Sequence, residues 1–355
     1  MTRSIKKWVP AAYVFSMALI MLGYVQYDPY QIDGDAVSYM DIASSILHGR
    51  WREIVNGLWN PGYPALLALG KLFTHADRMH ELQVFYCINY FIFLTSIACA
   101  TFFVQALLVL RLASIRELND RPAWVLSDRL VYLAAYSIIF FSWVHEFSPG
   151  KIRVDGLFAS LLLLAFGFLL RMAYLPTIAP AIGMGLCFGL AYLVKSPGLI
   201  IAVFTFSLLL IVQILQPRFF AKQWRILIAG LIFAAVAGPY IVALSIQKGR
   251  VDFGDSGSLN YAWYVSGTQP VHLLNRQTTR FGNSRVNLKH PDTQMMSDPI
   301  VVYFPHFPNA TYGTWFDPSY FNEGVTPHFS LRAQVRLTME QDDYPLSSGV
   351  AISCL

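Results

Sequence analysis

Long apolar stretches recur through the first 246 residues of the chain and are separated by short polar segments. Several approach the roughly 20 residues that an α-helix needs to cross about 30 Å of hydrocarbon. We predict seven membrane spans, at about 8–25, 83–110, 130–147, 154–171, 177–194, 197–215 and 226–246. The first follows a basic start, as in a signal peptide, but no small-residue cleavage site comes after it. We therefore interpret it as an uncleaved span.

The composition points to the same class of protein. Of the 355 residues, 55% are hydrophobic and only 13% are charged, whereas soluble domains carry about 25% charged residues. The mean hydropathy of +0.46 agrees with this. This composition argues against an ordinary soluble enzyme, and it excludes a disordered chain, a collagen-like chain and a disulfide-rich secreted module. Of the four cysteines, Cys87, Cys99 and Cys187 lie in apolar stretches and no pair has metal-ligand spacing, so we expect buried small hydrophobic residues.

The basic residues indicate a topology. If the seven spans alternate, one side holds most of them: Arg3, Lys6, Lys7, Arg111, Arg116, Arg121, Arg129, Arg171, Arg218, Lys222 and Arg225. The short loops on the other side hold Lys151, Arg153 and Lys195. The positive-inside rule then puts the N-terminus in the cytoplasm, and the loop 26–82 and the tail 247–355 in the periplasm or an equivalent lumen. The net charge of +5 is a topology signal and not a nucleic-acid patch.

The first outer loop carries an acidic pair, Asp33 and Asp35, before apolar residues at helical spacing. We predict a short interfacial helix that starts near Asp35 and is capped by Asp33. A second short amphipathic helix should follow Pro61. The acidic pair is either a cap on a solvated loop or includes a carboxylate that acts as general base or metal ligand.

Further charged residues flank the predicted spans. The loop before the fourth span holds Glu146, Arg153 and Asp155, and Lys195 stands between the fifth and sixth. A carboxylate at the edge of a span, such as Asp155, is a functional-site hypothesis. The alternative for Asp155 is an ion pair with Arg153 or Lys151. Lys195 either snorkels to the interface or anchors a phosphate.

These charged residues come from separate segments but share the predicted outer face. Asp35, Glu146, Asp155 and Lys195 would combine carboxylates with a cation. A carboxylate can accept the proton of an acceptor hydroxyl, and a cation can stabilise a phosphate leaving group. The sequence shows none of the nucleotide-binding or hydrolase motifs GxGxxG, Walker A, HExxH and GxSxG in a suitable context.

Three short motifs resemble one known family. They are Asp35-x-x-x-Tyr39 followed by Ala43, Leu47 and Gly49; Pro61-x-Tyr63-Pro64; and Gly189-Leu190-x-x-Leu193-x-Lys195-x-Pro197-Gly198. With Asp155 and its Leu-rich stretch, they resemble GT-C glycosyltransferases. The most similar are bacterial members of the protein O-mannosyltransferase and aminoarabinose lipid A transferase superfamily. The resemblance covers about residues 8–245.

The resemblance implies an all-α integral membrane protein. We expect a bundle of about seven transmembrane helices over 1–246, with an elaborated first outer loop, and a small mixed outer segment over 247–355. It further implies a glycosyltransferase of the bacterial inner membrane with a periplasmic active site. That enzyme would move a sugar, with inversion, from a polyprenyl-phosphate donor to a hydroxyl of a lipid, polysaccharide or protein.

The resemblance also implies roles for single residues. Asp35 would deprotonate the acceptor, Asp155 would lie near the acceptor or a metal, and Lys195 would neutralise the donor phosphate. Tyr39, Tyr63, Arg153 and Glu146 would line the substrate site. Some family members use a divalent metal, for which Asp33 and Asp35 are the candidates here.

Two positions depart from the aminoarabinose branch. That branch has a basic residue where this chain has Ser38 and a lysine where it has Asn60, so this chain lacks two phosphate anchors of that branch. Members usually carry more spans, and residues 343–355 resemble no finished domain, so we expect a truncated or frameshifted chain. The alternatives are a transporter or flippase, and an inactive assembly partner that binds a polyprenyl lipid.

The outer tail is rich in aromatic residues, notably at 260–264 and 308–321. Aromatic faces suit the C–H side of a sugar. The other interpretation is that these rings are the core and turn scaffold of the outer segment.

Overall fold

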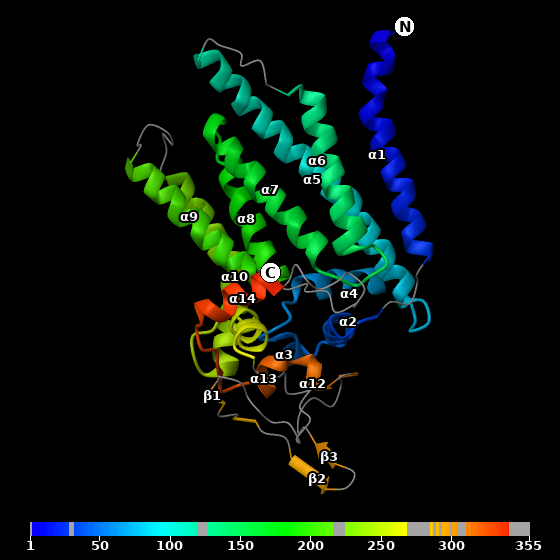
Figure 1. Cartoon of the computed structure of the whole chain (residues 1–355), viewed down its shortest axis with the longest axis vertical. Helices are drawn as coiled ribbons and strands as arrows, with labels where there is room; N and C mark the ends of the chain where they lie inside the picture. Colours follow the sequence, from blue (N-terminus) through cyan, green and yellow to red (C-terminus); the bar gives the residue numbers. More distant parts are fainter. Residues whose placement is uncertain are drawn as a thin grey trace.

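A computed structural model describes residues 2–27, 32–118, 126–215, 224–267, 285–286, 289–290, 293–297, 300–303, 310–311 and 313–340 (Figure 1). The helices are α1 (Thr2–Tyr27), α2 (Gly34–Leu47), α3 (Trp51–Ile54), α4 (Gly62–Thr74), α5 (Glu81–Leu118), α6 (Asp128–Ser142), α7 (Asp155–Tyr174), α8 (Ala179–Val194), α9 (Pro197–Leu215), α10 (Trp224–Lys248), α11 (Ser256–Asn260), α12 (Gly313–Phe316), α13 (Pro318–Phe321) and α14 (Leu331–Glu340). The π-helical turns η1 (Trp143–Phe147) and η2 (Tyr261–Val265) continue α6 and α11.

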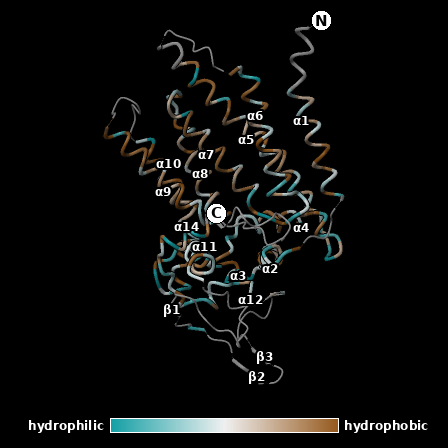
Figure 2. Tube along the Cα trace, in the orientation of Figure 1, coloured by the Kyte–Doolittle hydropathy of each residue, from teal (hydrophilic) through white to brown (hydrophobic). Residues whose placement is uncertain are grey.

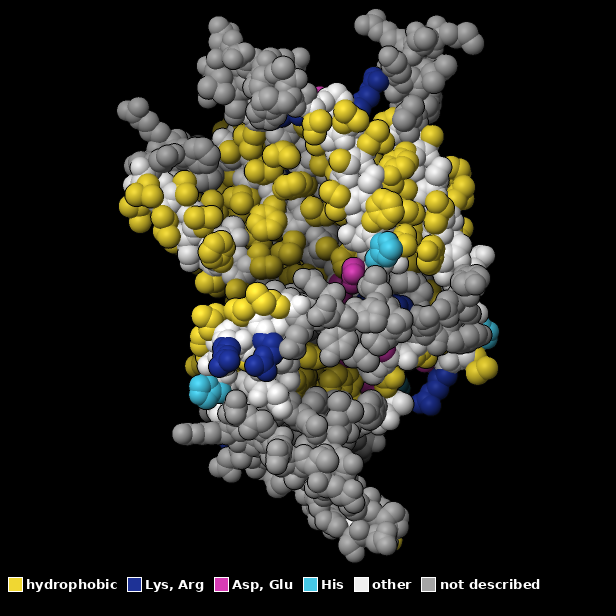
Figure 3. Space-filling view, viewed as in Figure 1, with side chains coloured by type: hydrophobic (Ala, Val, Ile, Leu, Met, Phe, Trp, Pro, Cys, Tyr) yellow, Lys and Arg dark blue, Asp and Glu magenta, His cyan; other side chains and the backbone are white. Residues whose placement is uncertain are grey.

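Five helices of the described chain are long and apolar enough to cross a membrane: Glu81–Ala113, Asp128–Phe147, Asp155–Tyr174, Pro197–Leu215 and Trp224–Lys248. Two more apolar helices, Pro10–Gln26 and Ala179–Val194, are shorter. The chain is therefore a helical membrane protein, as its hydropathy predicts. The apolar helices form the upper bundle in Figure 2. On the face seen in Figure 3, a broad yellow belt of exposed hydrophobic side chains lies over this bundle, as lipid contact requires.

The bundle packs closely because small residues face neighbouring helices. A Cβ atom added at Gly189 of α8 would lie 2.6 Å from the Cβ atom of Val236 on α10. One added at Gly167 of α7 would lie 2.6 Å from the Phe102 ring on α5. Small residues allow backbones to approach where lipid provides no hydrophobic driving force between helices. The helices α5, α7, α8 and α10 thus form a contiguous row.

Both short helices predicted in the first outer loop are present. Asp33 caps α2, since its Oδ1 atom accepts a hydrogen bond from the Ala36 N–H at 2.8 Å. The second helix, α4, begins directly after Pro61 and ends at His75, whose φ of 52° is left-handed. The two helices pack against each other below the bundle in Figure 1.

The outer tail folds back onto this first outer loop. The backbone N–H and hydroxyl of Thr311 donate to the Asp41 carboxylate on α2, at 2.6 and 2.7 Å. Asn56 Nδ2 donates to the Phe316 carbonyl at 2.5 Å. Segments about 260 residues apart in sequence thereby form one layer at the end of the bundle.

The remaining described parts of the tail are strands and short helices. Strand β1 (Arg285–Val286) pairs antiparallel with β4 (Val325–Thr326), and β2 (Thr293–Ser297) pairs with β3 (Ile300–Tyr303). Residues 343–355 lie outside the described residues. Cys99 and Cys187 are buried as predicted, but the prediction is wrong for Cys87, which is exposed on α5 because its apolar stretch faces outward there.

Candidate functional site

Asp155 and Lys195 form an ion pair at the end of the bundle. Asp155 is the first residue of α7, and Lys195 directly follows the last residue of α8. Because α7 and α8 pack together as an antiparallel pair, these positions meet, and Lys195 Nζ lies 2.6 Å from Asp155 Oδ1. The sequence offered an ion pair as the alternative role of Asp155, with Arg153 or Lys151 as its partner. The ion pair is present, but its partner is Lys195.

Arg153 connects the loop before α7 to the start of α2. Its Nη2 atom lies 3.7 Å from Asp33 Oδ2, and its Nη1 atom donates to the Glu146 carbonyl at 3.1 Å. The Glu146 side chain itself is exposed. Glu146 thus contributes a backbone oxygen that orients Arg153, whereas its side chain faces solvent.

Asp35 lies in the first turn of α2, close to these charges. Its Oδ1 atom accepts a hydrogen bond from the Trp315 indole N–H at 2.9 Å. Burial raises the pKa of Asp35 to about 6; the Trp315 hydrogen bond lowers it, Asp33 raises it, and Arg153 and Lys195 lower it. Asp35 is therefore a carboxyl group that changes charge near neutral pH, between two cations and a second acid.

Tyr39 and Tyr63 form the apolar wall behind Asp35. Both are buried, and their rings meet edge to face with centroids 5.5 Å apart. Burial raises the pKa of both phenols, and for Tyr39 the Asp35 and Asp155 carboxylates raise it further. Both therefore remain neutral at physiological pH.

Asn89 of α5 holds this wall to the loop that carries Arg153. It accepts a hydrogen bond from the Tyr63 hydroxyl at 2.8 Å and donates to the Lys151 carbonyl at 2.6 Å. Sequence reasoning missed Asn89, although a buried amide inside an apolar stretch was the available signal.

Trp315 fixes the position of Asp35 from the outer tail. Its ring stacks on Trp263 at 5.8 Å and meets Trp59 edge to face at the same distance. The Trp59 indole and the Ser38 hydroxyl both donate to the Trp315 carbonyl, at 3.0 and 2.9 Å. Trp263 and Trp315 of the tail therefore pack as a scaffold beside Asp35. This fits the interpretation that the aromatic rings of the tail have a structural role.

The two positions that depart from the aminoarabinose branch have structural roles. Ser38 holds the Trp315 carbonyl, and Asn60 Nδ2 donates to the Tyr192 carbonyl on α8 at 2.6 Å. Both are buried. Neither side chain is exposed as a surface phosphate anchor would be, and the cations that act on Asp35 are Arg153 and Lys195.

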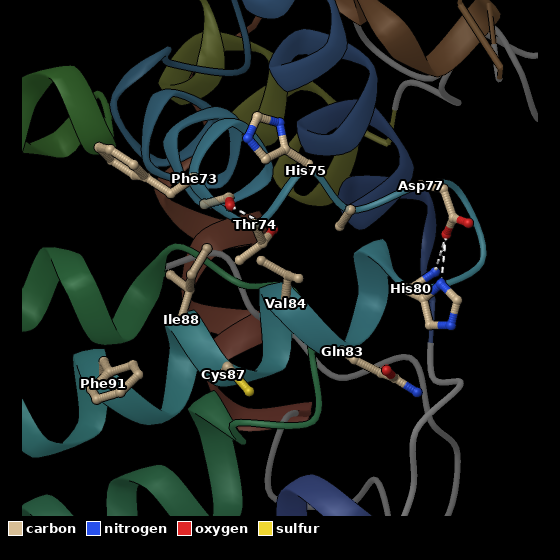
Figure 4. A pocket seen from close by; sticks show the side chains of 12 residues that line it. Phe73, Thr74, His75, Asp77, His80, Gln83, Val84, Cys87, Ile88 and Phe91 are labelled. Carbon is tan, nitrogen blue, oxygen red and sulfur yellow. Dashed lines mark hydrogen bonds and ion pairs between the residues drawn. The ribbon is translucent and has the colours of Figure 1, made fainter.

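A groove between the end of α4 and the start of α5 is separate from this cluster (Figure 4). Asp77 and His80 pair in it at 2.7 Å, and Phe73 and Phe91 border it. None of the predicted site residues lines this groove.

The carboxylates do not form an evident metal site. Asp33 Oδ1 caps α2, and Asp35 Oδ1 accepts from Trp315. Divalent cations such as Ca²⁺ take six or more oxygen ligands, several of them carboxylates. Within the described residues there is no group of three His, Cys, Asp or Glu side chains that could hold a metal ion. The prediction of a metal at Asp33 and Asp35 stays untested, and these two residues alone do not fit it.

Comparison of the chain with protein-family models, with curated proteins and with solved structures found no match in any of the three. The family resemblance therefore depends on the motifs alone.

Proposed function

We propose that the chain is a membrane glycosyltransferase that moves a sugar from a polyprenyl-phosphate donor to an acceptor hydroxyl, with inversion. The observation that carries this proposal is the partly buried Asp35 carboxyl group, whose pKa is raised to about 6 and which lies near Arg153 and Lys195. A base with a pKa near the working pH and a nearby pair of cations are the two groups that such a transfer needs.

The reaction would proceed by single displacement. The Asp35 carboxylate accepts the proton of the acceptor hydroxyl while the acceptor oxygen attacks C1 of the sugar. The bond between C1 and the phosphate oxygen breaks, and its electron pair leaves with the polyprenyl phosphate. Lys195 and Arg153 stabilise that phosphate. The Lys195 ammonium carries three N–H donors, and the contact with Asp155 uses one of them.

We further propose that all seven apolar helices cross the membrane. The 16 residues of α8 rise about 24 Å, and α8 packs between the spans α7 and α10. With the basic loops in the cytoplasm, Asp35 and Lys195 would face the periplasm of a bacterial inner membrane.

The position of the charges favours this function over transport. Asp155 and Lys195 lie at helix ends, whereas transporters place ionisable residues near the middle of the bilayer. An inactive partner that binds a polyprenyl lipid is the remaining alternative, and turnover distinguishes it from an enzyme.

The test compares donor consumption by the parent protein and by Asp35→Asn. Proteoliposomes with a panel of labelled polyprenyl-phosphate sugars and a membrane extract as acceptor source would be used. We expect one donor to be consumed by the parent, and the rate to fall at least about 100-fold in Asp35→Asn, the lower range for loss of a general base. Asp77→Asn, the same change on the same outer loop but at an exposed residue, should keep the parent rate.

Stability provides the control for folding. The pKa of Asp35 in the folded protein, about 6, lies above its ordinary 3.8. The protonated form is thus favoured on folding, and this stabilisation is lost as the pH rises through 6. At pH 7 an asparagine removes the cost of a buried charge, so the unfolding temperature of Asp35→Asn should be no lower than that of the parent. Equal consumption by Asp35→Asn and the parent would contradict the proposal.

A further inference from the structure

The helix α14 exposes an apolar stripe on the outer segment. Leu331, Val335 and Met339 follow one another at four-residue spacing and therefore share one face. Their side chains are 64%, 46% and 69% exposed. Phe329, just before the helix, is also exposed. Soluble proteins seldom leave such a contiguous stripe uncovered, and it indicates an interaction site.

Two arginines run beside this stripe. Arg332 and Arg336 each follow one of its apolar residues directly, so they form a parallel row about 100° around the helix. Both are exposed. A helix with an apolar face flanked by basic residues is typical of helices that lie in the interface of an anionic membrane.

The structure holds α14 near the end of the bundle. The Ser330 N–H donates to the Tyr261 hydroxyl at 3.2 Å, and the Phe329 ring stacks on the Tyr261 ring with centroids 6.2 Å apart. Tyr261 begins η2, which follows α10 after a short connection through α11. The outer segment thus fixes α14 close to the level at which α10 leaves the bundle.

The views of the whole molecule also place α14 beside the end of the bundle. Figure 1 draws α14 crosswise at the lower ends of α9 and α10. At the same place, Figure 3 shows a yellow strip next to the yellow belt of the bundle, with dark-blue side chains on its outer side. The apolar stripe therefore continues the lipid-facing belt, and the basic row borders it where phosphate groups of lipids would lie.

We propose that α14 is an interfacial helix that binds the anionic surface of the bilayer in which the bundle is embedded. Leu331, Val335 and Met339 enter the boundary between headgroups and acyl chains, and Arg332 and Arg336 contact lipid phosphates. Each basic residue near an anionic leaflet strengthens binding about fivefold. This contact ties the outer segment to the membrane and does not depend on the proposed sugar transfer.

The test places an environment-sensitive fluorophore on α14 of the full chain in nanodiscs, one chain to a disc. Cys87 and Cys354 are replaced by serine, since Cys99 and Cys187 are buried, and Met339→Cys carries the fluorophore. We expect blue-shifted emission and quenching by spin-labelled lipids, both stronger in discs that contain phosphatidylglycerol than in discs of phosphatidylcholine alone. The control site is Thr326→Cys on β4, exposed and on the strand pair that Figure 1 shows away from the bundle.

Charge variants separate the two parts of the proposal. Arg332→Gln with Arg336→Gln should lower the equilibrium constant for the membrane-bound helix about fivefold for each arginine, whereas the matching pair of lysine substitutions should retain it. Emission and lipid quenching at Met339→Cys equal to those at Thr326→Cys would overturn the proposal. So would a shielded fluorophore that lipid quenchers do not reach, because the stripe would then be covered by protein.

Discussion

At the scale of single residues, the properties of Asp35 come from neighbours that are distant in sequence. Its own helix supplies the partly buried position, and the cap of that helix is Asp33. Arg153, Lys195 and Trp315 come from three other segments. Burial disfavours the ionised form and the cations favour it, so the pKa of about 6 is a balance of opposing effects. A change in one neighbour should shift this balance in a known direction.

Replacement of Trp315 by phenylalanine tests that balance. The parent transfer rate should rise with pH up to about 6, and below that midpoint it should fall about tenfold per pH unit, because only the carboxylate accepts a proton. Trp315→Phe removes an indole N–H that lowers the pKa of Asp35. The midpoint of the pH profile of kcat/KM should therefore move to higher pH.

The matched control is Trp263→Phe. Trp263 stacks on Trp315, so this change keeps the indole that donates to Asp35 and should leave the midpoint where it is. An unchanged midpoint in Trp315→Phe, or a shift to lower pH, would show that the hydrogen bond does not tune Asp35.

Sequence reasoning identified some of these residues and not others, for a physical reason. The cap by Asp33 was predictable because it is local: donor and acceptor are three residues apart. The contact of Asp155 with Lys195 depends on how α7 and α8 pack, which a hydropathy pattern does not specify. The bond from Trp315 to Asp35 joins residues 280 apart, and no periodicity carries that information.

At the scale of elements, the end of α10 is tied to the outer segment by a buried charged cluster. Lys248 lies 3.7 Å from Asp252 and also contacts Asp255. Asp317, at the start of α13, is buried nearby; burial raises its pKa to about 6, and its hydrogen bond with Ser319 and the Lys248 charge lower it. The buried Lys248 and the half-exposed Arg250, which lies 2.9 Å from Asp252 and 3.1 Å from Asp255, thus offset the charge of several acids where the tail leaves the bundle.

Removal of that lysine should be costly. Only 9% of the Lys248 side chain is exposed. Lys248→Met would remove the buried cation of the cluster and leave Asp252 and Asp255 with only the half-exposed Arg250. Breaking a buried pair costs about 3–5 kcal/mol, and because Arg250 still pairs with two of the acids, we expect the lower end of that range. The control, Lys289→Met, breaks an ion pair with Glu323 whose lysine is 60% exposed, which should cost about 0–1 kcal/mol. Denaturant unfolding in detergent measures both, and equal losses would mean that the buried cluster adds no more stability than an exposed ion pair.

At the scale of the whole molecule, the helix ends lie at two opposite ends of the bundle, and the direction of insertion inferred from the basic residues stays a prediction. Figure 1 shows the N-terminus and the starts of α6 and α10 at one end of the bundle, and α2, α4 and α12 at the other. The five long apolar helices were predictable because each depends only on the length of one apolar stretch. The layer formed by the first loop and the tail was not, because it depends on matched side chains such as Thr311 and Asp41.

Cysteine labelling in intact cells tests the direction of insertion. In a background with Cys87→Ser and Cys354→Ser, a membrane-impermeant thiol reagent should label Ser258→Cys, an exposed position on α11 of the outer segment. Ser127→Cys, exposed at the start of α6, should react only after the membrane is opened. The reason is that basic residues such as Arg129 and Arg171 are retained in the cytoplasm. The reverse labelling pattern would place Asp35 and Lys195 on the cytoplasmic side, where a donor presented in the outer leaflet could not reach them.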